Sequence, residues 1–289
     1  MGIRTDLALE SVQAVKTSVT SEIDGIRQEN YEKAGCTVTQ ITVENQNAVK
    51  LIGKPMGQYV TVEMQSSLDE YSDDFEQQVD VIADEIKRLS PTSGDVLVIG
   101  LGNNDITPDA LGPMTARQIF ATRHIPKNIE GLEEFSGLRP VCSIAPGVLG
   151  QTGIEVAEIS EAVCMKTSPS VVLAIDALAC SEISRLGNTI QITDTGISPG
   201  SGVKNSRREL SKETLGAPVI AIGVPTVIDM QTIANSITGQ EHEVSEFSDM
   251  MVTPRSVDKL IERSAKLIAL GINKAFQPDM TIEDITSLI

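Results

Sequence analysis

The chain has 289 residues, of which 40% are hydrophobic, and it carries a formal net charge of −17 at pH 7 with a pI near 4.5. This length is sufficient for one large α/β domain with a sizeable core. The acidic balance excludes a protein that binds nucleic acid through the phosphate backbone. We therefore expect no nucleic-acid partner. The sequence also contains no long apolar span or signal peptide, so we expect no membrane partner.

Cysteine and histidine usage argues against a metal centre. The four cysteines lie far apart without a CxxC pair, and the two histidines have neither HxxH nor HExxH spacing. We therefore predict no metal and no other cofactor, and a reduced, cytoplasmic protein whose cysteines pack as small hydrophobic residues. The residues concerned are Cys36, Cys142, Cys164, Cys180, His124 and His242.

The N-terminal region predicts a helix from residue 5 to about residue 33. Its apolar residues roughly follow helical spacing, and Thr5 or Asp6 can cap the first turn. Gly35 follows directly, and we expect it to end the helix because glycine is common just beyond a helix C-terminus.

The next fifty residues predict two strands and a second helix. Residues rich in β-branched side chains indicate strands at Thr37–Val43 and Tyr59–Glu63, with a turn-prone Gly-Lys-Pro at 53–55 between them. Apolar residues then recur every three or four positions over residues 75–89. That spacing is typical of an amphipathic helix with one buried face.

The pattern changes from residue 95 onward. Short, nearly continuous apolar runs occur at 96–99, 171–175 and 218–222, as expected for strands buried on both faces of a parallel sheet. Helical patterns lie between these runs, and a strong one covers residues 257–268. The predicted fold class is α/β, with a mostly parallel central sheet flanked by helices and an added N-terminal α+β layer.

Two acidic residues stand where catalytic groups collect in open α/β sheets, beyond the carboxyl ends of strands. Asp176 follows the run at 171–175 directly, and Asp109 follows the run at 96–99 after a loop of nine residues. Each has a structural alternative. Asp109 can stabilise a helix start behind Pro108 as an N-cap or first-turn acid, and Asp176 can cap a loop.

A pair of carboxylates can hydrolyse peptide bonds without serine, cysteine or metal. Two acids held close together cannot both ionise easily, so one keeps a proton and donates a hydrogen bond to the substrate carbonyl. The other deprotonates a water molecule. The same two acids could instead hold a divalent cation, although two oxygen donors without a histidine make a weak site.

The turn Gly100–Gly102 also suggests a phosphate-binding loop, because it follows a short apolar run and precedes a predicted helix. However, Asp105 occupies the position of the third glycine in a GxGxxG pattern, and the Gly-Lys-Ser/Thr of a P-loop is absent. A nucleotide- or phosphate-binding enzyme using this turn is therefore one alternative function. A non-catalytic binding module is a second alternative.

Asp194-Thr195-Gly196 matches the Asp-Thr-Gly triplet of pepsin-like proteases. Those enzymes are all-β and need two such loops, whereas the triplet occurs once here in an α/β pattern. The triplet alternatively opens the loop 195–202, which is followed by basic residues. Such a loop can receive a phosphate or an acidic peptide side chain, or simply lie solvated.

Seven blocks of the sequence, in order between residue 3 and about residue 273, are longer and more specific than any of these motifs. They are Arg4–Ala8, Gly100–Asn103, Thr107–Pro113, Ser143–Gly153, Ala174–Leu178, Asp194–Val203 and Ile222–Thr226. Together they resemble the germination protease family of spore-forming bacteria, which is classed as atypical aspartic proteases.

The resemblance implies an endopeptidase that degrades small acid-soluble spore proteins during germination, in the cytoplasm of the forespore and spore core. It also implies a homotetramer, a zymogen activated by removal of a propeptide, and a fold similar to that of hydrogenase maturation peptidases. The two essential aspartates of the family correspond to Asp109 and Asp176 in their blocks. The chain begins within two residues of the first block, so the long prosegment of some relatives is not expected.

We therefore expect one α/β peptidase domain over residues 1–289, with a helix and strand layer at 1–90 and a catalytic core at 91–289. Asp109 and Asp176 are the predicted catalytic residues. The loop after residue 195 and the block at 143–153 are predicted to contact the substrate. The predicted substrate-binding residues are Ser143, Gly147, Gly200, Ser201, Gly202, Lys204 and Arg207.

Overall fold

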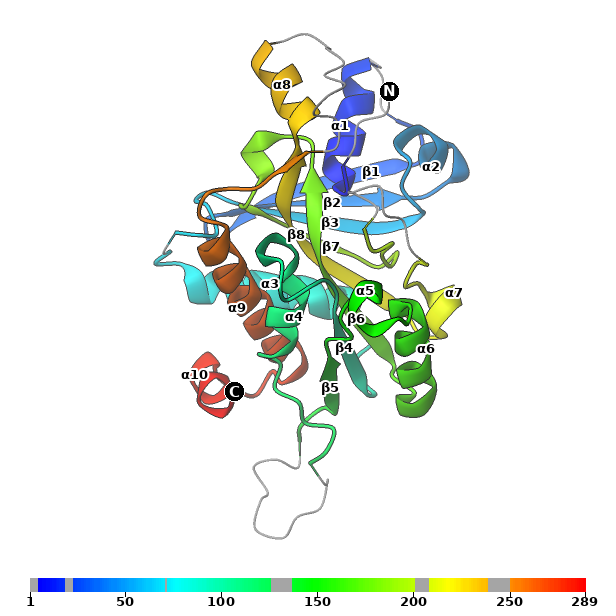
Figure 1. The fold of residues 1–289 in the computed structure, drawn as a ribbon, viewed down its shortest axis with the longest axis vertical. Helices are drawn as coiled ribbons and strands as arrows, with labels where there is room; N and C mark the ends of the chain where they lie inside the picture. The colour runs from blue at the N-terminus through cyan, green and yellow to red at the C-terminus, as the bar shows by residue number, and fades with distance from the viewer. Residues whose placement is uncertain (1–4, 19–22, 71, 126–136, 201–207, 239–249) are drawn as a thin grey trace.

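The computed structural model describes residues 5–18, 23–70, 72–125, 137–200, 208–238 and 250–289 (Figure 1). The strands are β1 (Ile26–Lys33), β2 (Cys36–Val43), β3 (Gly57–Met64), β4 (Val96–Gly100), β5 (Val141–Ile144), β6 (Val171–Cys180), β7 (Thr189–Thr193), β8 (Val219–Asp229) and β9 (Met251–Val252). The α-helices are α1 (Ala8–Ser18), α2 (Gln46–Ile52), α3 (Phe75–Leu89), α4 (Leu111–Ala116), α5 (Leu149–Thr152), α6 (Val156–Thr167), α7 (Lys212–Leu215), α8 (Met230–Thr238), α9 (Val257–Phe276) and α10 (Ile282–Leu288). Two short 3₁₀ helices are η1 (Thr107–Asp109) and η3 (Ile183–Arg185).

These strands form one mixed sheet in the order β1-β2-β3-β7-β8-β6-β4-β5, with β9 paired to β8. The apolar runs of the sequence become β4, β6 and β8, which pair in parallel together with β5. The pairs formed by β1, β2, β3 and β7, and that between β7 and β8, are antiparallel. The α/β class is therefore confirmed, and parallel pairing is confined to the half of the sheet built from β4, β5, β6 and β8.

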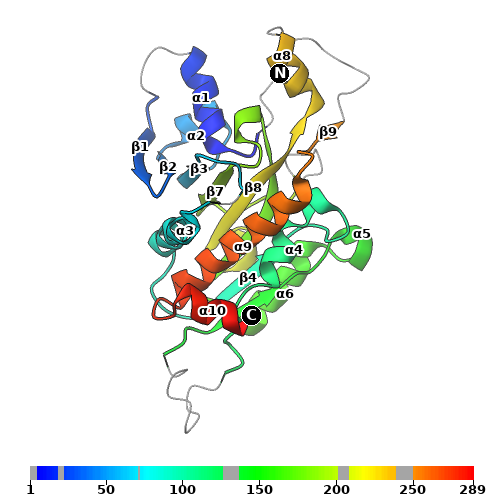
Figure 2. The ribbon, with the colours of Figure 1, turned by 90° about the vertical axis from the view of Figure 1, so that its left-hand side faces the viewer.

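Helices cover both faces of the sheet. On one face, α3, α4 and α9 pack over the central strands, and Figure 2 shows α9 crossing that face with α3 beside it. On the other face, α6 and α7 cover the parallel strands, while α1 and α2 cover β2 and β3. The second face is thus covered at its two ends by different helices.

The first thirty residues differ from the prediction of one long helix. The helix α1 is confirmed at 8–18, but residues 26–33 form β1, which pairs along its whole length with β2. The hairpin turns at Ala34 and Gly35, which both have positive φ angles of 53° and 66°, as required by a two-residue turn between right-twisted strands. Because β1 is an exposed edge strand, its side chains show no alternation from which the sequence could indicate a strand.

The other predicted elements of the N-terminal region are confirmed as β2, β3 and α3. Through the pairing of β3 with β7, however, the N-terminal strands extend the central sheet and do not lie on it as a separate layer. The strong late helical pattern is confirmed as α9.

The cysteines behave as expected from their spacing. All four are free thiols; Cys36, Cys164 and Cys180 are buried and Cys142 is half-buried. Burial raises the pKa of Cys36 and of Cys164 from 9.0 to about 11, so both thiols stay protonated and unreactive at neutral pH.

Candidate active site

Asp109 is held by the loop that connects β4 to α4. The backbone N–H of Asn103 donates hydrogen bonds to the carbonyl oxygen of Asp109 at 3.1 Å and to its Oδ2 at 2.8 Å. The N-cap of α4 is Ala110, without a side-chain hydrogen bond at that position. The carboxylate of Asp109 therefore braces the loop and does not cap α4.

The glycines before Asp109 allow a close approach of backbone to backbone. A Cβ atom added to Gly102, whose φ is +110°, would lie 2.0 Å from the carbonyl oxygen of Asp109. A Cβ atom on Gly100 would lie 2.2 Å from the carbonyl oxygen of Gly112 in α4. These glycines are needed because the turn packs against its own chain, and this packing argues against the alternative of a phosphate cradle.

Asp176 lies inside β6 and not just beyond its end as the sequence suggested. The neighbouring strand β4 stops earlier, at the pair Gly100 and Ile175, while β6 and β8 continue past this point. Asp176 therefore begins the part of β6 that has lost its neighbour on one side. Asp176 is buried, with only 6% of its surface exposed. Its Oδ1 accepts a hydrogen bond of 2.9 Å from the N–H of Ala177.

The structure brings the two predicted catalytic residues together. Asp109 and Asp176 line one cavity of about 360 Å³, whose walls come from the loop before η1, from β6 and β8, and from the segment around residue 198. The charged residues that line it, among those the structure describes, are these two and Asp6, all of them acidic. Within the described ranges no group of three or more histidine, cysteine, aspartate or glutamate residues is arranged to hold a metal ion.

Two threonine hydroxyls of the cavity wall are used for bracing. Thr226 Oγ1 donates to the carbonyl oxygen of Pro108 at 2.8 Å, and Thr253 Oγ1 donates to the carbonyl oxygen of Thr226 at 2.9 Å. These bonds tie β8 to the residue before Asp109 and tie the chain after β9 to β8. The arrangement supplies two carboxylates on a rigid frame, which suits acid–base chemistry.

The predicted substrate-binding residues fall in three places. Gly200 lines the cavity of the two aspartates. Ser143 on β5 and Gly147 are not among its lining residues, and the Ser143 hydroxyl donates to the carbonyl oxygen of Ala116 at 2.9 Å. The remaining four, Ser201, Gly202, Lys204 and Arg207, lie outside the described residues.

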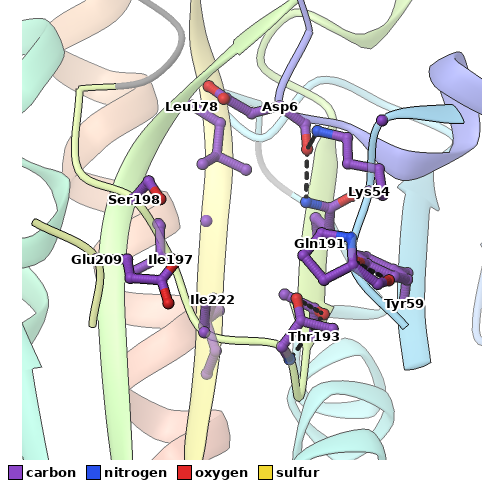
Figure 3. Close-up of a pocket in the computed structure, with 16 residues that line it drawn as sticks. Asp6, Lys54, Tyr59, Leu178, Gln191, Thr193, Ile197, Ser198, Glu209 and Ile222 are labelled. Atoms are coloured by element: carbon purple, nitrogen blue, oxygen red, sulfur yellow. Dashed lines mark hydrogen bonds between the residues drawn. The ribbon is translucent and has the colours of Figure 1, made fainter. Parts of the chain in front are cut away.

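A second cavity of about 220 Å³ adjoins the first and shares Asp6, Leu178, Ile197 and Ser198 with it (Figure 3). Lys54 lines this second cavity and is not among the residues that line the first. The Lys54 Nζ donates to the carbonyl oxygens of Thr5 and Asp6 at 3.0 and 2.9 Å.

Burial lowers the pKa of Lys54 below its ordinary value of 10.5. Gln191 Nε2 donates to the same carbonyl oxygen of Asp6 at 3.0 Å (Figure 3). The sequence analysis did not select Lys54 or Gln191, because they belong to no motif and meet only through the fold.

Asp194 of the Asp-Thr-Gly triplet has a local structural role. Its carboxylate accepts hydrogen bonds from Gln58, at 2.7 Å from the backbone N–H and 3.4 Å from Nε2. Asp194 is absent from the residues that line the two cavities. The geometry thus supports the interpretation of the triplet as a turn.

Comparison with known proteins decides the family. The family model described as germination protease matches residues 4–239. The germination protease of Clostridium tetani is 40% identical, with 100% of both chains covered. This chain belongs to the germination protease family. Other relatives in the family are the germination proteases of Clostridium perfringens, 39% identical over 99% of both chains, and of Bacillus velezensis, 41% identical over 98% of this chain and 76% of the relative.

As a member of the germination protease family, the chain is a protease with a role in spore germination. Among solved structures, the NiFe hydrogenase maturation protease HycI of Thermococcus kodakarensis is similar at 17% identity and a TM-score of 0.37, covering 64% of this chain and 96% of that one. In the part of the germination protease chain that the structure describes, no helix has both the length and the apolar character needed to cross a membrane.

Proposed function

We propose that this germination protease is an endopeptidase of atypical aspartic type that degrades small acid-soluble spore proteins in the cytoplasm of the spore. The observation that carries the proposal is the shared cavity of Asp109, at the end of η1, and Asp176, within β6. Membership of the family, over nearly the whole chain, supports a protein substrate. The homotetramer and the zymogen state belong to the proposal through the resemblance alone.

The proposed reaction uses one carboxylic acid and one carboxylate. The protonated acid donates a hydrogen bond to the carbonyl oxygen of the scissile peptide bond, and the carboxylate takes a proton from a water molecule as its oxygen attacks the carbonyl carbon. The tetrahedral intermediate then breaks its C–N bond, and a proton passes to the leaving amine. No cofactor takes part in this scheme.

The test is replacement of each acid by its isosteric amide. We expect Asp109→Asn and Asp176→Asn each to lower kcat/KM on a small acid-soluble spore protein by at least roughly 10²-fold, because an amide can neither accept the proton from water nor donate an acidic one. Digestion followed by mass spectrometry measures the cleavage. Circular dichroism establishes that both variants remain folded.

Asp194→Asn is the matched control, because Asp194 is the acid of the pepsin-like triplet and an amide oxygen can still accept the 2.7 Å hydrogen bond from the backbone N–H of Gln58. We expect this variant to retain wild-type cleavage. Wild-type activity in folded Asp109→Asn or Asp176→Asn would overturn the mechanism. Intact substrate in a stable complex with the wild-type protein would favour a binding module.

A further inference from the structure

We propose that the protease binds its substrate as an extended strand, which pairs through its main chain with the free edge of β6 at Ala177. This inference rests on the proposed function. It adds to that function a specific binding element and a substrate class, namely polypeptide segments that are extended or can become extended.

The first observation is the unequal length of neighbouring strands. β4 ends at Gly100, and the N–H of Leu101 makes the last bond of this ladder to the carbonyl oxygen of Ile175 at 2.8 Å. β6 continues for five residues, to Cys180, with β8 still paired on its other side. Among the described residues, no strand therefore pairs with the side of β6 that faces the aspartate cavity beyond the pair of Gly100 and Ile175.

The second observation concerns which main-chain groups this edge presents. Along a strand, alternate residues direct both N–H and C=O to the same neighbour, so Ile175, Ala177 and Ala179 face the side of β4. The N–H of Ala177 donates to Oδ1 of Asp176, and no described residue is recorded as donating to the carbonyl oxygen of Ala177. Ala177 lines the aspartate cavity, so a ligand there can reach both groups.

The chain itself already uses the polar main-chain groups of this edge at Ala179. The N–H of Asp6 donates to the carbonyl oxygen of Ala179 at 3.0 Å, and the N–H of Ala179 donates to Oδ2 of Asp6 at 2.8 Å. Figure 3 shows Asp6 beside Leu178 in the second cavity, and both residues also line the first. Asp6 therefore occupies the edge at Ala179, whereas none of the described residues donates to the carbonyl oxygen of Ala177.

The chemistry of the cavity favours a main chain over an anionic ligand. Its described lining holds three carboxylates and no lysine, arginine or histidine, and these carboxylates disfavour a phosphate or nucleotide. Exposed Ile106, together with Val227 and Met251, adds apolar surface beside the edge. An uncharged backbone with one donor and one acceptor per residue matches these surroundings.

Pairing at Ala177 would also position the scissile bond. Paired strands lie about 4.8 Å apart and rise by about 3.3 Å per residue, so a substrate residue opposite Ala177 places its adjoining peptide bonds next to Asp176. In the complex, the N–H of Ala177 would donate to the substrate carbonyl oxygen instead of to Oδ1 of Asp176. Asp176 loses that hydrogen bond at the moment when its oxygen is needed for water.

The experiment is an amide-to-ester scan of a cleaved peptide. The bond cut in a small acid-soluble spore protein is first located by mass spectrometry, and a synthetic peptide of about ten residues around it serves as the parent. Each N–H except that of the scissile bond is then replaced in turn by an ester oxygen. We expect kcat/KM to fall by about tenfold or more at the one position whose N–H donates to the Ala177 carbonyl, and by less than about threefold at both neighbours.

A second measurement does not depend on turnover. A non-cleavable hydroxyethylene analogue of the parent peptide is added to the wild-type protein, and amide hydrogen exchange is followed over residues 176–180. We expect the exchange of Ala177 to slow by at least about tenfold, with no comparable change in β1, the exposed edge strand at the far end of the sheet.

The outcomes separate the two proposals. If the parent peptide is cleaved but every ester substitution has an equal, small effect, the strand-pairing proposal is wrong and the proposed function stands. Inhibition by the analogue without slower exchange at Ala177 would overturn the pairing in the same way. If the wild-type protein cleaves neither the spore protein nor the peptide, the proposed function is wrong, and the strand-pairing inference, which rests on it, is wrong as well.

Discussion

Gly112 is the residue at which α4 touches the sheet. A Cβ atom at this position would lie 2.2 Å from the carbonyl oxygen and 2.4 Å from the nitrogen of Leu101, and 2.5 Å from the carbonyl oxygen of Ile175. All three are backbone atoms, two of them in the residue directly after β4 and one in the residue of β6 directly before Asp176. Gly112 thus sets the distance between α4 and β6, and with it the approach of Asp109 to Asp176.

We expect Gly112→Ala to destabilise the protein by about 3 kcal/mol, because backbone atoms cannot move aside as a flexible side chain can. Thermal unfolding would then occur about 6–12 °C lower, and protease activity would fall as α4 moves from the sheet. The matched control is Gly150→Ala in α5, where a Cβ atom meets nothing within 4 Å. Equal unfolding temperatures for the two variants would contradict this role for Gly112.

At the scale of elements, α1 is fastened to the end of β6 by a buried cluster of charges. The side chain of Glu10 is 1% exposed and accepts hydrogen bonds from the N–H and Oγ of Ser181 and from the N–H of Glu182. Arg185 lies 3.6 Å from Glu10 and also pairs with Glu63 at 3.0 Å. Since Asp6 lies two residues before the start of α1, this cluster helps to hold the segment that borders both cavities.

Removing one member of the cluster leaves its partner charged and buried. We expect Arg185→Met to lower the free energy of unfolding by about 3–5 kcal/mol, as found when a buried ion pair is broken on one side. The double variant Glu10→Gln with Arg185→Met should lose less than the sum of the two single variants. Urea unfolding of the four proteins measures the coupling, and strict additivity would show that Glu10 and Arg185 do not interact.

At the scale of the whole molecule, the N-terminal residues and the protease core share one sheet. The continuity runs through β3, which pairs with β7 along five residues. The largest apolar cluster also joins both parts, because it contains residues of β2, β3 and α3 together with β4, β6, β8 and α9. We therefore propose that residues 1–289 form a single domain that unfolds as one unit.

The chain offers a direct test of this unity, since it lacks tryptophan and its tyrosines, Tyr31, Tyr59 and Tyr71, all lie before residue 90. Tyrosine fluorescence therefore reports on the N-terminal part, whereas far-UV circular dichroism also reports on the 20-residue helix α9. We expect the two urea transitions to coincide at one protein concentration. A tyrosine transition at clearly lower urea would indicate two domains.

Several features could be predicted from local sequence alone. Continuous apolar runs indicated β4, β6 and the start of β8, and helical spacing indicated α3 and α9, because these patterns depend on near neighbours in the chain. The rule that functional groups follow strand ends selected Asp109 and Asp176, which the structure places in one cavity. Gly200, from the loop after residue 195, lines the same cavity, while substrate contact by this loop stays a prediction.

Other features depend on which segments pair in three dimensions. β1 is a strand because its main chain pairs with β2. Its mostly exposed side chains do not form an alternating hydrophobic pattern that would predict this pairing. Asp176 lies at an open edge only because β4 ends before β6 does, and Lys54 meets Asp6 only across the sheet face. The sequence by itself determined the family and the strand-forming runs and selected the two acids as candidates, since these are local or motif properties. Strand register, edge exposure and the second cavity were decided by the tertiary structure, because they depend on long-range contacts that periodicity does not encode.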